Sequence, residues 1–161
     1  MVSLNNKKGF TIVELLIVIV VIGILATLVI VTFTGIQQKG RNSQRQTDIN
    51  AIDSHVEAFY AQHGFYPSLA DLQDTAAGGF VPTFMKGLDP EALKDPKQAS
   101  TGTIGATAGA AQYSYVASGT GCVNTTDTTI TSGEPVDNGC DAFVITAQME
   151  GGGANYVKQS N

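Results

Sequence analysis

The sequence has no tryptophan, only two histidines and two cysteines, and charged side chains at only 14% of its 161 positions. On one helix, His55 and His63 would be separated by about 12 Å of rise, which is too far to share a metal ion. No nucleophile elbow, phosphate-binding loop or regularly spaced carboxylate pair occurs. These absences predict a protein that is not an enzyme and has neither a metal site nor a cofactor.

Acidic side chains outnumber basic ones by 14 to 9. Beyond Ile36 there are 13 acidic residues and 7 basic ones, a net charge of −6. That sign disfavours binding to nucleic acid or to anionic lipid. The length leaves room for one modest domain and an anchor.

The longest apolar run extends from Leu15 to Ile36, 22 positions without a charged residue. As an α-helix it would be about 33 Å long, enough to cross a hydrocarbon core of about 30 Å. It is too long for the apolar region of a secretory signal. Basic residues flank both ends and leave the orientation open by the positive-inside rule: Lys7, Lys8, Lys39, Arg41 and Arg45.

The helical pattern continues past this run, because no proline occurs between residues 37 and 62. Residues 37–48 are polar all round, which is unusual for a helix that packs on its own domain. An apolar stripe at spacings of three and four follows, and Gly64 supplies a stop. The stripe consists of Ile49, Ile52, Val56, Phe59 and His63. The sequence therefore predicts one helix from near Phe10 to His63.

The remainder predicts a small α+β head. Residues 64–111 form a long connection with breakers at Pro67, Pro82 and Pro96, and its low-complexity end, 99–111, is expected to be mobile. Short helices are expected after two capping residues, Ser68 and Asp89. Strands are expected at 112–118, weakly at 123–131, at 141–149 and at 155–158, the last two forming a hairpin.

The segment KKGFTIVELLIVIVVIGILATLVI, residues 7–30, resembles the N-terminal signal of type IV pilins and pseudopilins. Leader charge, Gly9, Phe10, Glu14 and the apolar run all coincide in register. Beyond about residue 65 the resemblance concerns architecture only. One departure is Val31, where many members have a helix-breaking proline, so the bending of the anchor during assembly is left open.

The resemblance implies that a membrane aspartyl peptidase cuts between Gly9 and Phe10 on the cytoplasmic side. The same enzyme would methylate the new Phe10 amine, with S-adenosylmethionine as donor. Lys7 and Lys8 would hold the leader inside, and the glycine's missing Cβ would let the backbone enter a narrow cleft. Glu14 would pair with the amine of a neighbouring subunit. The spacing from Thr11 to Glu14 also fits a capping box, and both roles can coexist.

The implied organisation is a leader at 1–9, a transmembrane and filament-core helix at 10–36, its amphipathic continuation at 37–63, and a head at 64–161. The head comprises the connection 64–111 and a sheet region 112–161. The expected fold is α+β, with the upper half of the helix packed on a small antiparallel sheet.

The implied function is that of a structural type IV pilus subunit. It would span the cytoplasmic membrane once, N-terminus inside, and then polymerise into an extracellular helical filament. Expected partners are copies of itself and other pilins, the prepilin peptidase and methyltransferase, an assembly platform and ATPase, and membrane lipid, without direct nucleic acid binding. Two alternatives stay open: a pseudopilin of a type II secretion or competence system, and a membrane-tethered binding protein that never polymerises.

Cys122 and Cys140 lie in glycine- and asparagine-rich turns. In an exported domain such a pair favours a disulfide over two free thiols, and without a nearby histidine it is a poor zinc site. The 123–138 segment offers oxygen ligands, but it lacks the spacing of a calcium loop.

Charges on the polar part of the helix suggest a register for assembly. A basic zone (Lys39, Arg41, Arg45) precedes an acidic zone (Asp48, Asp53, Glu57) by about 16 Å of helix. Axially shifted neighbouring helices would place opposite charges together. The alternative is a solvated surface with local pairs such as Arg45–Asp48.

Overall fold

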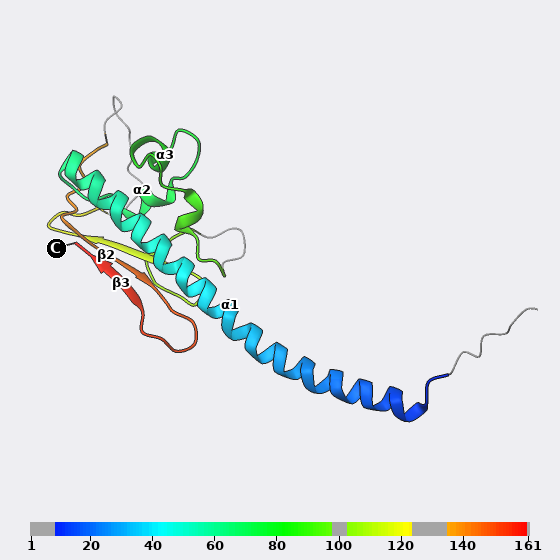
Figure 1. Ribbon diagram of the computed structural model, residues 1–161. Coiled ribbons are helices and arrows are strands. Elements are labelled where there is room, and N and C mark those ends of the chain that lie inside the picture. The colour runs from blue at the N-terminus through cyan, green and yellow to red at the C-terminus, as the bar shows by residue number, and fades with distance from the viewer. Residues whose placement is uncertain (1–8, 98–102, 124–134, 161) are drawn as a thin grey trace, which may run out of the picture. The chain divides into compact units, whose positions relative to one another are not determined.

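The computed structural model describes residues 9–97, 103–123 and 135–160, and the chain divides into two compact units, Met1–Gln38 and Lys39–Asn161. Four helices come first: α1 (Ile12–His63), α2 (Leu69–Gln73), α3 (Phe80–Phe84) and the 3-10 helix η1 (Pro90–Leu93). Three strands follow, β1 (Ser114–Ser118), β2 (Ala142–Ala147) and β3 (Tyr156–Gln159) (Figure 1). This order confirms the predicted α+β class.

Helix α1 ends where the sequence predicts. Gly64 has φ +83° and donates its N–H to the carbonyl of Tyr60 at 2.8 Å. This left-handed conformation is available to glycine at little cost and terminates the helix. Among the described residues, α1 is the one helix that is long and apolar enough to cross a membrane by length and composition.

The apolar part of α1 lies in the first unit and buries none of its described side chains. All described large apolar residues from Phe10 to Ile36 are exposed. At about 25 cal/mol per Å² of apolar surface, leaving this face in water is strongly unfavourable, so lipid or other helices must cover it.

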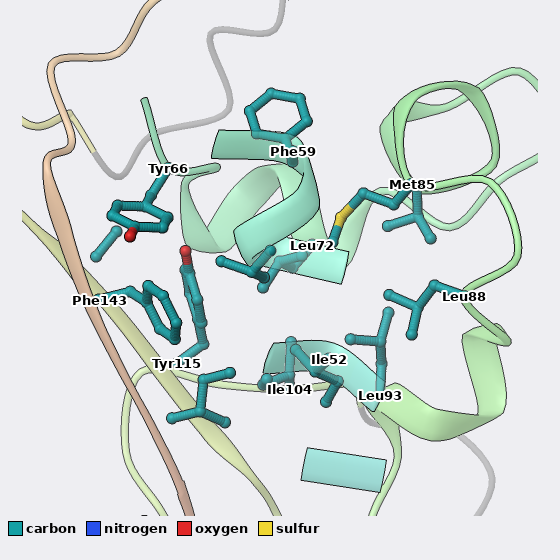
Figure 2. Packing of buried hydrophobic residues seen from close by; sticks show 14 of the residues in the cluster. Ile52, Phe59, Tyr66, Leu72, Met85, Leu88, Leu93, Ile104, Tyr115 and Phe143 are labelled. Atoms are coloured by element: carbon teal, nitrogen blue, oxygen red, sulfur yellow. The ribbon is translucent and has the colours of Figure 1, made fainter. Parts of the chain in front are cut away.

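The second unit is built around the predicted stripe of α1. Ile49, Ile52, Val56 and Phe59 are at most 1% exposed. They belong to one core cluster with residues from α2, α3, η1 and the sheet (Figure 2). The 39–63 part of α1 therefore packs on the head by the apolar spacing visible in the sequence.

The sheet has the order β1-β2-β3 and is antiparallel throughout. The hairpin of β2 and β3 confirms the strongest strand prediction. Alternation places Tyr115, Phe143 and Ile145 in the core, while Val116 and Val144 face outward. The weak strand predicted at 123–131 lies, apart from Val123, outside the described residues.

Local capping explains the short helices. Ser68 and Asp71 form a capping box at α2, and Asp89 caps η1, which is a 3-10 helix with Pro90 at its start. The prediction that Pro82 breaks helical structure was wrong, because Pro82 lies inside α3. It is the third helical residue, where the backbone N–H has no intrahelical acceptor to lose.

The expectation that 99–111 is mobile was wrong for its described part, residues 103–111. Ile104 is completely buried in the core. Gly105 donates to the carbonyl of Tyr113 and accepts from the N–H of Tyr115, both at 2.9 Å. Burial of Ile104 and the backbone hydrogen bonds of Gly105 thus attach this segment to the head.

Phe59 tests the core directly. Its ring lies 4.5 Å from that of His63, 5.2 Å from Phe80 and 5.4 Å from Phe65, measured between centroids. Phe59→Ala is expected to lower the free energy of unfolding by about 3–5 kcal/mol, because it removes these contacts and leaves a cavity. Denaturant unfolding of the full chain in detergent measures the loss. The adjacent, more exposed Tyr60→Ala serves as control, and an equal loss in both variants would contradict the assignment.

Candidate processing and assembly site

The Gly9–Phe10 peptide bond precedes the helix. Neither residue is helical, Phe10 is 81% exposed, and a Cβ on Gly9 would have no neighbour within 4 Å. The bond is therefore accessible and non-helical, as entry into a protease cleft requires. The predicted leader residues Lys7 and Lys8 lie outside the described residues.

Glu14 lies in the first turn of α1 and forms the capping box given above as an alternative. The hydroxyl of Thr11 accepts from the N–H of Glu14 at 3.2 Å. A carboxylate oxygen of Glu14 accepts from both the N–H and the hydroxyl of Thr11, each at 3.4 Å. These long, exposed bonds hold the carboxylate at the helix start, where the helix dipole also favours negative charge.

No cation among the described residues forms an ion pair with Glu14. Its charge is therefore uncompensated within this part of the chain, although the side chain is positioned. The backbone of α1 stays helical through Val31, the position at which the family pattern often has proline.

Arg45 is the largest fully buried side chain of the head. Its guanidinium donates to both carboxylate oxygens of Asp95, at 2.7 and 2.9 Å, and lies 2.9 Å from an oxygen of Glu150. Arg41 makes a second two-pronged contact with Glu150, both distances being 2.6 Å. Two arginines of α1 thus hold the segment after η1 and the turn between β2 and β3.

The side-chain amide of Asn42 completes this cluster by binding the backbone of Glu150. Asn42 donates to the carbonyl of Glu150 at 3.2 Å and accepts from its N–H at 2.9 Å. Hydrogen bonds from the arginines, that from Arg41 being the strongest effect, lower the pKa of Glu150 from 4.5 to about 2. We call Arg41, Asn42, Arg45, Asp95 and Glu150 the collar cluster.

The collar cluster corrects two expectations. The polar stretch of α1 does pack on its own domain, and Arg41 and Arg45 are occupied by carboxylates of the same head rather than left for a neighbouring helix. The local pair Arg45–Asp48 does not form either. Asp48 instead accepts from the hydroxyl of Tyr113 at 2.8 Å and from Gln44 at 2.7 Å, while burial raises its pKa.

The signal that could have found this cluster is helical spacing. Arg41, Arg45 and Asp48 extend the apolar stripe backwards in steps of four and three, on the face that continues with Ile52. A polar residue in step with an apolar stripe is a candidate for a buried, paired side chain. Its partners Asp95 and Glu150 are distant in sequence and carry no such signal.

Cys122 and Cys140 form the disulfide favoured by the sequence, with an S–S distance of 1.99 Å. The N–H of Tyr66 donates to the carbonyl of Cys140 at 2.8 Å, which ties this turn to the residues just after α1. In the described part of the chain, no three His, Cys, Asp or Glu side chains are grouped so that they could hold a metal ion.

Comparisons with known proteins find one family model and several curated relatives. The prokaryotic N-terminal methylation motif matches residues 4–30. The type II secretion system core protein G of Dickeya chrysanthemi is 31% identical over 64 residues, 40% of this chain and 42% of that protein. The type IV major pilin protein PilA of Myxococcus xanthus is 33% identical over 66 residues, 41% of this chain and 30% of that pilin.

Core protein G of Escherichia coli K12 is 31% identical over 64 residues, 40% of this chain and 44% of that protein. The match thus spans less than half the length of each of these relatives. No solved structure matches the chain.

Gly9→Val is expected to block leader removal, because a β-branched side chain would enter the scissile position. Mass spectrometry of the protein from cells with the processing enzyme should find residues 1–9 still attached. Gly23→Val is a matched control, since a Cβ there also meets nothing within 4 Å. A normal Phe10 terminus in the Gly9→Val protein would refute the cleavage assignment.

The lowered pKa of Glu150 predicts that the stability of the folded state depends on pH. Because its pKa is lower in the folded state, its contribution is complete above about pH 4.5 and is lost as the pH falls towards 2. Burial raises the pKa of Asp48 and Asp71, so these groups act in the opposite direction. Thermal unfolding of the full chain in detergent between pH 6 and 2 should therefore show a steeper acid loss for wild type than for Glu150→Gln. Parallel curves would mean that the collar cluster does not stabilise the head through this charge.

Proposed function

We propose that the chain is a membrane-anchored subunit of the type IV pilin and pseudopilin family, processed at Gly9–Phe10 and polymerised into a helical filament. The match of the N-terminal methylation motif to residues 4–30 and the similarity to core protein G and to the pilin PilA support this proposal. The observation that carries the proposal is one arrangement. An accessible Gly9–Phe10 bond and a Glu14 without an ion-pair partner among the described residues stand at the start of a helix whose described apolar side chains up to Ile36 are all exposed.

Lipid covers this apolar surface before assembly, and the helices of other subunits cover it afterwards. In such a helical core Glu14 would lose its water, and only an opposite charge makes that tolerable. Cleavage creates one, since the new amine of Phe10 lies about one helical turn from Glu14. Pairing between the amine of one copy and the carboxylate of the next is heterologous and propagates without closing.

Two finer assignments share this chemistry. We propose a pilus subunit first, which the disulfide-closed C-terminal region supports. A secretion pseudopilin is the second candidate. In its favour, the 64 matched residues are 40% of this chain and 42% and 44% of two core G proteins, so the matched segment takes up a similar share of each. The 66 residues matched to the Myxococcus pilin are only 30% of that pilin. Deletion of the gene distinguishes them. Loss of surface pili in electron micrographs identifies a pilus subunit, whereas retained pili together with loss of secretion of an extracellular protein identify a pseudopilin.

Glu14 variants test assembly separately from capping. Glu14→Ala should leave membrane insertion and cleavage largely intact but abolish or greatly reduce filaments in cells where it is the only copy. Glu14→Gln is the sharper variant, because glutamine preserves a capping box but has no charge. If charge pairing drives assembly, glutamine should fail like alanine. Wild-type filament levels with glutamine and loss with alanine would assign Glu14 to capping alone.

A further inference from the structure

Most basic side chains beyond Ile36 form ion pairs within the chain. Of the seven beyond Ile36, five form ion pairs with carboxylates of the same chain: Arg41, Arg45, Lys94, Lys97 and Lys158. Within the described residues, Lys39 and Lys86 have no carboxylate partner. In a head of net charge −6, a lysine without an internal partner is a site that can attract a carboxylate of another molecule.

Lys86 lies at a pocket of about 420 Å³ between the last turns of α1 and the end of α3. The pocket also contains both histidines of the chain, and none of its lining residues is acidic. The partly exposed His63 and Phe84 form an aromatic wall, with ring centroids 6.0 Å apart, and the buried ring of Phe59 packs against both. His55 sets its Nδ1 2.9 Å from the carbonyl of Ala51. The pocket therefore combines apolar surface with basic groups.

The disulfide turn offers the complementary chemistry. Val136 and Val123 are about half exposed, and the exposed Asp137 and Asp141 pair with no cation in the described part of the chain. We call residues 136–141 the acidic turn. It presents an apolar side chain directly beside a carboxylate.

The acidic turn is also held in shape. Cys140 is bonded to Cys122, the N–H of Gly139 donates to Asp137 at 2.8 Å, and the N–H of Val123 donates to the carbonyl of Asn138 at 3.0 Å. A surface fixed before contact loses little conformational entropy on docking.

We propose that the acidic turn of one copy docks into the pocket of a second copy, with Asp137 against Lys86 and Val136 against the aromatic wall. The inference rests on the proposed function, because it places the contact between subunits of one filament. Each copy carries both halves at different positions, so the contact is heterologous and can repeat along a helix. It also neutralises charge where acidic heads would otherwise repel each other.

A charge exchange tests the contact in cells with one copy of the gene. Lys86→Glu and Asp137→Lys should each lower sheared filament yield roughly tenfold, because each places like charges together. The double variant Lys86→Glu/Asp137→Lys should recover most of the wild-type yield. Lys94→Glu is the matched control, since Lys94 pairs with Glu91 of the same chain and does not line the pocket, and it should leave the yield near wild type.

A zero-length cross-link keeps the inference separate from filament formation. Full-length protein from ¹⁴N- and ¹⁵N-labelled cells is solubilised in detergent, mixed and reconstituted into the same vesicles, and carbodiimide treatment should then join Lys86 to Asp137 in peptides of mixed label. A double variant no better than either single variant, or absence of that mixed peptide, overturns the docking. If the wild type forms no filaments, the proposed function fails, and the cross-link alone decides whether copies meet through this pocket. Cross-links from Lys86 to another protein would likewise overturn it.

Discussion

The buried guanidinium of Arg45 is the constraint on which the head depends. A charge removed from water is tolerated only when opposite charges and hydrogen bonds surround it, and here Asp95 and Glu150 do so. Satisfying Arg45 fixes three things together: which face of α1 meets the head, where the chain runs after η1, and where the β2–β3 turn lies. The apolar stripe that starts at Ile49 then buries its side chains in one orientation only.

The two parts of helix α1 consequently differ in what surrounds their side chains. Up to Ile36 the apolar side chains that the structure describes are exposed, and covering them requires lipid or other helices, whereas from Arg45 onward the same helix buries charge and apolar surface against the rest of its own chain. The contrast between Glu14 and Arg45 follows from this division. Arg45 finds its carboxylates within the chain, while Glu14 is positioned by a capping box and finds no cation in the described residues. A charge left in that state is suited to intermolecular pairing, and the pocket at Lys86 repeats the situation with the opposite sign.

The excess of acidic side chains in the head makes charged groups without an internal partner, such as Lys86, important for contacts with other molecules. Most basic side chains form ion pairs within the chain, so few cations remain that could attract the carboxylates of another copy. Such a surface favours a limited set of relative positions, because only those positions bring opposite charges together. In the proposed filament, specific contacts between heads would then need no large apolar patch on the head.

The sequence by itself determined the features that depend on local spacing. These are the motif around Gly9 and Glu14, the helix that ends at Gly64, the stripe from Ile49 to Phe59, the caps at Ser68 and Asp89, and the β2–β3 hairpin. Each is encoded by residues within a few positions of one another. Tertiary structure alone decided that Arg45 is buried with Asp95 and Glu150, that Ile104 orders a low-complexity segment, and that the pocket brings Lys86 to both histidines. Those outcomes join residues far apart in the chain, and the energy of a buried charge or a filled core depends on partners that no local pattern names.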